Sequence, residues 1–311
     1  MTKSFYSIGE TVHASIPSSA KPMKELLEGG PDAYTKPSDA LDAVKLMIES
    51  QAEEGADYIA VNLDAFGEND PQIAVDAMTE YSKLVRKCGR GVPICIDSSN
   101  DNVLKAGLTE WYNTDGAVKQ PLVNSIKIYT MADMLPLKKE YDFAFIGLLM
   151  KEGSSSHSID DLYNLAREIF TEAMKYGFKA EEIFYDSTIF PLAIDMPMMP
   201  GEPGYTYKYF EAIKKIKSDP DMKGVHFTGG ITNCSRDLPG RKIGVMRAFV
   251  HKGMEYGLDS GIVNVKNHLD EGEAGADLLE LVDAYAKQDG STERLNDVMM
   301  LMGKFCQQCR G

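Results

Sequence analysis

Eight short apolar segments most constrain the fold of this chain, because helical patterns lie between them along most of its length. Each is a continuous apolar run of the kind that is buried on both faces in a parallel sheet. The segments are residues 4–9, 57–63, 93–97, 121–127, 143–150, 182–186, 224–229 and 259–265. Eight strands joined by helices predict a single (β/α)8 TIM barrel. A doubly wound sheet is the alternative, but no GxGxxG motif follows an early strand to favour it.

The stretch after Asp70 carries a clear helical pattern. Its apolar residues recur at spacings of three and four, which places them on one buried face. They are Ala74, Met78, Tyr81, Val85 and Cys88. Asp70 before a proline is a typical N-cap and first-turn pair, so a helix is predicted over residues 71–88. Other helices are expected to end at Gly55, Gly177 and Gly257, because glycine accepts the left-handed conformation that ends a helix.

No shift in composition marks a domain boundary, so residues 1–311 are interpreted as one domain. The barrel core is expected over about residues 4–290, followed by a C-terminal helix and tail over residues 291–311. Two connections are longer than a bare barrel needs, over residues 11–38 and residues 187–204. Both are expected as loops on the strand-to-helix side, where barrel active sites are built.

Composition and charge exclude several classes of protein. The net charge is −14, with 33 basic against 47 acidic residues, which argues against nucleic acid as a partner. No apolar run approaches the roughly 20 residues that span a bilayer, and the N-terminus lacks a signal-peptide core. Five cysteines, an odd number, fit a reducing compartment better than a disulfide framework. A cytoplasmic protein without a membrane partner is therefore predicted.

No metal site is predicted. The five histidines are scattered along the chain without an HxxxH or HxH pair. They are His13, His157, His226, His251 and His268. Cys306 and Cys309 form a lone CxxC near the C-terminus, which supplies only half of a structural zinc site. A solvated tail is the preferred interpretation of this pair, and a metal or redox site is the alternative.

Polar residues stand where several predicted strands end. Asp97-Ser98-Ser99-Asn100 follows the strand over 93–97, Asn124 lies inside an apolar strand, and Asp186 ends another. In a barrel these ends face one shared mouth, and carboxylates and amides can hold the N–H and carbonyl edge of a flat heterocycle. Ser99 or Asn100 is interpreted as a helix cap, whereas Asp97 is interpreted as functional. An unpaired amide at Asn124 would cost about 1–3 kcal/mol, so it needs a partner in the core or in a ligand.

Several motifs, in order over about residues 5–265, resemble those of the pterin-binding barrel family. They are Ile8-Gly9-Glu10, Glu54-Gly55-Ala56 with Val61-Asn62-Leu63, Cys95-Ile96-Asp97-Ser98-Ser99-Asn100 with Lys105-Ala106-Gly107-Leu108, Val123-Asn124-Ser125, Ile146-Gly147-Leu148, and Tyr185-Asp186 with Pro191. The chain is most similar, within that family, to the cobalamin-dependent methyltetrahydrofolate methyltransferases. The resemblance therefore implies a pterin-binding TIM barrel.

The resemblance also implies which residues form the site. Asp97, Asn124 and Asp186 would bind the pterin ring. The full set expected to bind the folate is Glu10, Asn62, Asp97, Asn124, Gly147, Asp186 and Gly230. The set expected to act in catalysis is Asp97, Asn124 and Asn233.

The reaction implied by this resemblance is an SN2 methyl transfer between N5 of tetrahydrofolate and the cobalt of a corrinoid. The chain departs from the family at two places. Ala60 stands where the family often has an acid, and Gly230 stands where it has an asparagine near N5. Asn233 is expected to reach that place from one turn later. Weaker proton donation to N5 would bias the enzyme toward making 5-methyltetrahydrofolate, as in anaerobic demethylation pathways such as that of glycine betaine.

The corrinoid is expected to come from a separate protein, because the chain has no DxHxxG-type corrinoid motif. The methionine-rich segment over residues 196–200 either contacts that corrinoid protein or packs on its own barrel. Homologous barrels suggest a homodimer. Two other functions remain open: a pterin enzyme like dihydropteroate synthase, whose late Lys-x-Arg signature is missing here, and a folate-binding barrel without catalysis.

Overall fold

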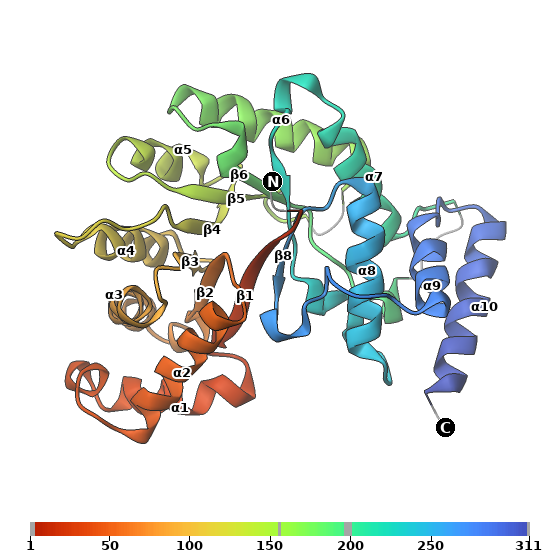
Figure 1. The fold of residues 1–311 in the computed structure, drawn as a ribbon. Helices are drawn as coiled ribbons and strands as arrows, with labels where there is room; N and C mark the ends of the chain where they lie inside the picture. Colours follow the sequence, from red (N-terminus) through yellow and green to blue (C-terminus); the bar gives the residue numbers. More distant parts are fainter. Residues whose placement is uncertain (1–3, 155–156, 196–200, 310–311) are drawn as a thin grey trace.

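The computed structural model describes residues 4–154, 157–195 and 201–309. All eight predicted strands are confirmed, and they form one parallel sheet in the order β7-β6-β5-β4-β3-β2-β1-β8 (Figure 1). The strands are β1 (Tyr6–His13), β2 (Tyr58–Asn62), β3 (Ile94–Asp97), β4 (Leu122–Lys127), β5 (Ala144–Leu148), β6 (Ile183–Asp186), β7 (His226–Phe227) and β8 (Ser260–Val263).

The ends of the sheet meet just beyond β7. Gly230 forms a parallel bridge with Ile262 of β8, and the Ile262 N–H donates to the carbonyl of Gly229 at 2.9 Å. The predicted (β/α)8 barrel is therefore confirmed, although its seam between β7 and β8 is thin.

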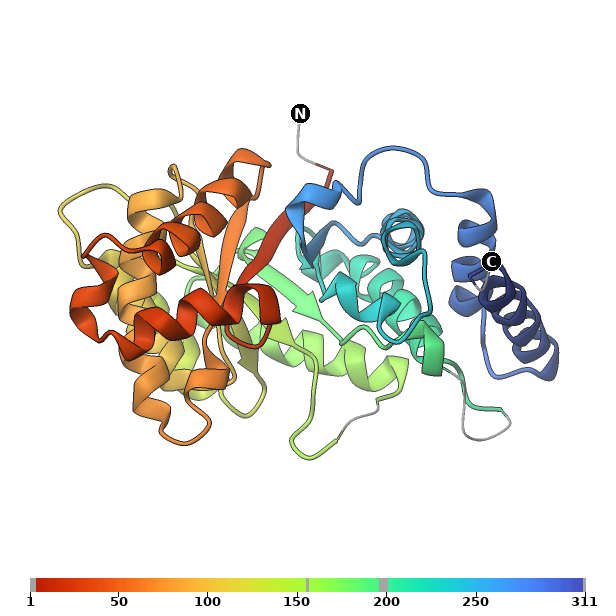
Figure 2. The same ribbon diagram turned by 90° about the horizontal axis from the view of Figure 1, so that it is seen from below.

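Helices surround this barrel on the outside (Figures 1 and 2). They are α1 (Pro17–Glu28), α2 (Asp39–Glu53), α3 (Pro71–Cys88), α4 (Asp101–Tyr112), α5 (Met131–Met134), α6 (Ile159–Lys175), α7 (Tyr205–Lys217), α8 (Lys242–Tyr256), α9 (Ala276–Ala286) and α10 (Thr292–Gln308). Helix α9 lies between α8 and α10, so the last two helices extend the outer layer on the side of α8 (Figure 2). No helix in the described part of the chain is long and apolar enough to cross a membrane.

The helix predicted over residues 71–88 is confirmed as α3, and all five residues of its predicted apolar face are buried. The Asp70 side chain caps it by accepting a 3.0 Å hydrogen bond from the N–H of Gln72. The three predicted helix-ending glycines have positive φ, at +89° for Gly55, +86° for Gly177 and +109° for Gly257. At these positions a side chain would strain the backbone, which is why glycine ends these helices.

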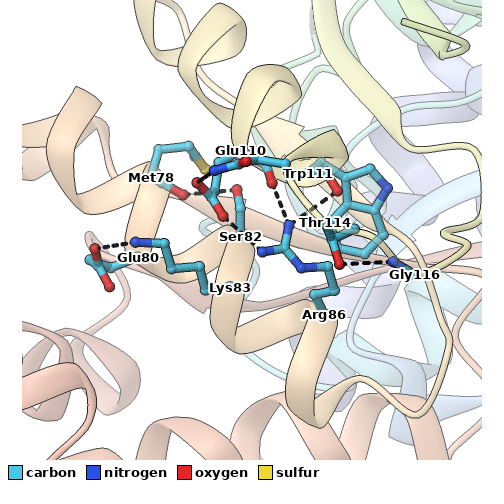
Figure 3. A network of polar contacts seen from close by, with 10 residues as sticks. Met78, Glu80, Ser82, Lys83, Arg86, Glu110, Trp111, Thr114 and Gly116 are labelled. Carbon is cyan, nitrogen blue, oxygen red and sulfur yellow. Dashed lines mark hydrogen bonds and ion pairs between the residues drawn. The ribbon is translucent and has the colours of Figure 1, made fainter.

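Arg86, near the end of α3, braces this helix against α4 (Figure 3). Arg86 pairs with the buried carboxylate of Glu110 at 2.7 Å and donates to the carbonyls of Glu110 and Trp111 in the last turn of α4. The Glu110 carbonyl also accepts the N–H of Asn113 at 3.1 Å, and the guanidinium adds further donors to the carbonyls at this end of the helix. Lys83 pairs with Glu80 on the same helix, at 2.8 Å.

The prediction of a loop over residues 11–38 is wrong. Strand β1 continues to His13, and the segment then forms α1 and a 3-10 helix, η1 (Pro31–Tyr34). The prolines suggested a loop, but Pro17 occupies the first turn of α1, where a missing N–H costs nothing. Met23 and Leu26 supply the buried face that holds this helix on the barrel.

The C-terminal CxxC also differs from its preferred interpretation. Cys306 lies in the last turn of α10 and Cys309 caps that helix, and both half-buried side chains pack against the core. The Cys306 thiol lies 3.9 Å from the sulfur of Met302. The pair therefore belongs to a packed helix rather than to a solvated tail.

The lower part of the barrel interior is apolar. A separate cluster of buried side chains fills it, contributed by Ile8, Ala60, Cys95, Leu122, Ala144, Ile146 and Phe184. Tyr6 and Tyr58 pack against this cluster, and both contact the ring of Phe184 edge-on. A barrel of this size is a packed core and not a pore. His226 stacks on Phe184 of this layer and pairs with Asp259, whereas the polar side chains of the barrel mouth lie at the carboxyl ends of the strands.

Candidate active site

Four polar residues lie side by side across four neighbouring strands. His13 of β1 pairs in register with Asn62 of β2, Asn62 with Asp97 of β3, and Asp97 with Asn124 of β4. All four side chains are half-buried. We call these four residues the polar row. It forms one side of the barrel mouth, directly above the apolar layer.

A cavity of about 230 Å³ opens at this mouth. Val12, Ala60 and Ile262 supply apolar surface to it, and the remaining lining is mostly polar. The polar residues around it are Glu10, His13, Asn62, Asp97, Thr232 and Asn233, with Gly230 beside them. The fold thus brings together five of the residues predicted to form the site, namely Glu10, Asn62, Asp97, Gly230 and Asn233.

Asn124 contacts the site through Asp97. Its Nδ2 donates to Oδ1 of Asp97 at 2.9 Å, so the amide has a partner and its cost of burial is met. Burial raises the pKa of the Asp97 carboxyl to about 7, although a hydrogen bond from Asn62 lowers this pKa in part. The nearby carboxylates of Asp64 and Asp186 raise this pKa further.

Asp186 ends β6, on the far side of the mouth from the polar row. Burial raises the pKa of this carboxyl to about 6, while the N–H of Thr188 donates to its Oδ1 at 2.7 Å and lowers it. The raised pKa of Asp97 includes repulsion from Asp186, so the two carboxylates share one electrostatic environment. Perturbed carboxylates in a cleft are typical of a functional site.

The polar tetrapeptide after β3 has a divided role. Asp64 accepts hydrogen bonds from Ser98 Oγ at 2.5 Å and from Ser99 N–H at 2.9 Å. Asn100 caps α4 by accepting from the N–H of Asn102, which confirms the cap predicted at Ser99 or Asn100. Asp97 takes part in neither role and faces the cavity instead.

Asn233 reaches the place beside Gly230 from the 3-10 helix η7 (Ile231–Ser235). A Cβ atom on Gly230 would lie 3.1 Å from the Asn233 Nδ2, so this amide fills the space next to the glycine. On the same turn, Thr232 Oγ1 donates to Glu10 at 2.6 Å. Burial raises the pKa of Glu10, while this hydrogen bond lowers it.

Three residues predicted for the site do not line this cavity, namely Asn124, Gly147 and Asp186. A Cβ on Gly147 would meet Tyr185 at 3.2 Å and Ile169 of α6 at 3.5 Å, so that position faces the helix layer. The methionine-rich segment over residues 196–200 lies outside the described residues.

Sequence reasoning missed His13 and the role of Asp64. His13 was one of five scattered histidines, and only the length of β1 places it in the mouth. Asp64 follows β2 and anchors the turn that carries Ser98 and Ser99. The pairing of Asp64 with two serines can be predicted only when β2 and β3 are known to be neighbours.

Comparison with known proteins defines the family. The pterin binding enzyme family matches residues 32–264, about three quarters of the chain. The chain therefore belongs to the pterin-binding enzyme family. A methylcorrinoid:tetrahydrofolate methyltransferase from Eubacterium limosum is 24% identical over 266 residues, which cover 83% of this chain and 84% of that protein.

Solved structures agree with the fold. A dihydropteroate synthase from Clostridium difficile superposes with a TM-score of 0.55 at 16% identity, covering 86% of this chain and 94% of that one. A dihydropteroate synthase from Coxiella burnetii gives a TM-score of 0.53 at 12% identity, covering 86% and 91%. At these identities the likeness concerns the barrel alone.

Proposed function

We propose that this protein transfers a methyl group from a methylcorrinoid to N5 of tetrahydrofolate, forming 5-methyltetrahydrofolate. The observation that carries the proposal is the pairing of Asp97 with Asn124 above an apolar barrel floor, beside a cavity of about 230 Å³. The printed name of the Eubacterium limosum relative supports the same reaction.

The polar groups suit the pyrimidine edge of a pterin. That edge presents N–H donors next to a carbonyl acceptor, and a carboxylate matches the donors while an amide matches either kind of group. Asp97 and Asp186 would accept from the ring, and Asn62 and Asn124 would hold Asp97 in place or bind the ring directly. Ala60 offers apolar surface below.

Methyl transfer needs no nucleophile from the protein. The N5 lone pair attacks the methyl carbon, the cobalt–carbon bond breaks with both electrons remaining on cobalt, and N5 then loses its proton. The barrel contributes by holding N5 in line with the methyl group, since orientation supplies a large share of the rate in such reactions.

The proposed direction of transfer rests on the donor beside Gly230. Asn233 supplies the amide there, and an amide can hydrogen-bond an amine nitrogen but cannot protonate it. Removing a methyl group from N5 requires such protonation or an equivalent acid, whereas adding a methyl group does not. We therefore propose tetrahydrofolate as the acceptor in the reaction that this enzyme performs; the enzyme sets the rate of transfer, and the two methyl carriers set its equilibrium.

A separate corrinoid protein is the proposed methyl donor. Tyr129, which follows β4 at the mouth, is 46% exposed, and Ile194 in the connection after β6 is 55% exposed. Both residues follow the carboxyl ends of strands, on the side where the cavity opens, and exposed apolar side chains there are suited to contact a docked partner that brings the methylcorrinoid to N5.

The test is a turnover assay under anaerobic conditions with free methylcobalamin and tetrahydrofolate. Loss of methylcobalamin absorbance and formation of 5-methyltetrahydrofolate are followed together. Asp97→Asn should lose most activity, whereas Asp115→Asn, the same change in an exposed loop before β4, should keep it. Folate binding without turnover would support a non-catalytic barrel, and a faster reverse reaction with 5-methyltetrahydrofolate and cob(I)alamin across neutral pH would contradict the proposed direction.

A further inference from the structure

His13 lines the substrate cavity, yet neither the family resemblance nor the proposed reaction uses it. It precedes residues 32–264, which match the pterin-binding family, so the match assigns it nothing. It nevertheless stands in the polar row, next to Asn62 and one strand away from Asp97. His13 and Asp97 line the same cavity, so a ligand bound there lies within reach of both.

A β-bulge in β1 turns His13 toward the cavity. Glu10 and Thr11 together lie opposite the single residue Ala60 of β2. With regular alternation Val12 would point inward and His13 outward, because Ile8 points inward. The extra residue reverses this order. Val12 packs in the outer core, although it also borders the cavity, and His13 stands in register with Asn62 at the mouth.

The bulge is held by a dedicated contact. The Oε1 of Gln51, a buried residue of α2, accepts the N–H of Thr11 at 3.2 Å. The Nε2 of Gln51 donates to the carbonyl of Met47 at 3.1 Å, which fixes the amide in this orientation. The buried Gln51 thus accepts the Thr11 N–H in the bulge. This contact stabilises the bulge, and with it the reversed order of side chains.

Hydrogen bonding also fixes the tautomer of His13. The backbone N–H of Ser15 donates to Nδ1 at 3.1 Å, and a nitrogen that accepts a hydrogen bond carries no proton. In the neutral ring the proton therefore lies on Nε2. Among the described residues none pairs with Nε2, so this N–H is the group available to a ligand. Burial lowers the pKa of His13 although the Asp64 carboxylate raises it, which favours the neutral ring.

We propose that His13 is a further substrate-binding residue: a neutral imidazole whose Nε2–H donates a hydrogen bond to an acceptor of the pterin ring. The inference rests on the proposed function, because it takes the folate as the ligand. It completes the chemistry of the polar row, in which Asp97 accepts from the ring and His13 donates to it. A neutral donor has the further advantage that it forms no ion pair with Asp97, so the carboxylate stays available to the substrate.

The first test compares tetrahydrofolate binding by isothermal titration. His13→Ala should weaken binding about 5- to 10-fold, the usual effect of removing one hydrogen bond from a buried site. His13→Gln should stay within about threefold of the unchanged protein, because the glutamine amide can place an N–H near the position of Nε2. His268→Gln, an exposed histidine outside the mouth, is the matched control and should bind normally.

The second test determines which nitrogen of the His13 ring carries the proton, and it needs no variant. Long-range proton–nitrogen NMR of protein labelled with 15N-histidine distinguishes the two tautomers. The Nε2–H form is expected before and after tetrahydrofolate binding, with the Nε2 signal shifting on binding. An Nδ1–H ring, a His13 signal indifferent to folate, or normal binding by His13→Ala would overturn the inference. If one of these results came from protein that binds tetrahydrofolate and transfers methyl groups, the role of His13 would fail and the proposed function would stand. If the unchanged protein bound no tetrahydrofolate, the role of His13 and the proposed function would both fail.

Discussion

Replacing Asp97 by asparagine should make the free protein more stable while removing its function. The folded protein raises the pKa of this carboxyl from its ordinary 3.8 to about 7, so the ionised form is less favourable in the folded state than in the unfolded chain. The resulting cost is absent below about pH 4 and grows as the pH rises to 7. At pH 8 it reaches about 4 kcal/mol at most, because water in the cavity reduces the effect of burial.

Asparagine does not ionise, so the variant avoids this cost and can still accept the hydrogen bond from Asn124. The free energy of unfolding, measured by urea denaturation, should be higher for Asp97→Asn than for the unchanged protein at pH 8. The gain should be smaller at pH 5, by up to about 3 kcal/mol. Asp115→Asn should show no such difference between the two pH values, because that carboxylate is exposed.

The reasoning about Asp97 would be refuted by a variant that is less stable at pH 8, or by a gain that is equal at pH 5 and pH 8. A confirmed gain would identify Asp97 as a residue that is kept for binding at a cost in stability, which is common in active sites.

Three further predictions test other parts of the site and its support. Asn124→Ala should leave Asp97 without its amide partner and weaken tetrahydrofolate binding about tenfold by isothermal titration, with normal binding contradicting the pairing. Gly230→Ala should displace the Asn233 side chain, because its Nδ2 lies 3.1 Å from the new Cβ. The turnover number should fall while the melting temperature stays nearly unchanged. An unaltered turnover number would show that Asn233 does not act in the site. Arg86→Met should leave the buried carboxylate of Glu110 without a counter-charge and lower the free energy of unfolding, measured by urea denaturation, by about 3 kcal/mol. Adding Glu110→Gln should recover part of this loss. If the second change recovers nothing, the loss of the Arg86–Glu110 ion pair is not what destabilises the protein.

The sequence predicted those parts of the protein that depend on local pattern. Each strand is a continuous apolar run, and α3 repeats its apolar residues at helical spacing, so both could be found without knowing their neighbours. Asp97 could be singled out because a carboxylate at the end of a buried strand has few structural explanations. Gly55 and the other helix-ending glycines followed from backbone sterics alone.

What the sequence did not predict depends on contacts between distant segments. The bulge that turns His13 inward exists because Gln51, 40 residues after Thr11, accepts the unpaired N–H. Helix α1 was hidden by prolines that suggest a loop, and only its packing on the barrel explains why it forms. Asn233 was expected at the site on the strength of family resemblance, and its place beside Gly230 depends on the tight turn of η7.

The most direct test of the central claim is a crystal structure of the protein with tetrahydrofolate bound. The account predicts the pterin in the barrel mouth, with its amino-pyrimidinone edge within hydrogen-bonding distance of Asp97 and N5 near Asn233. A pterin bound elsewhere, or one that turns this edge away from Asp97, would contradict it.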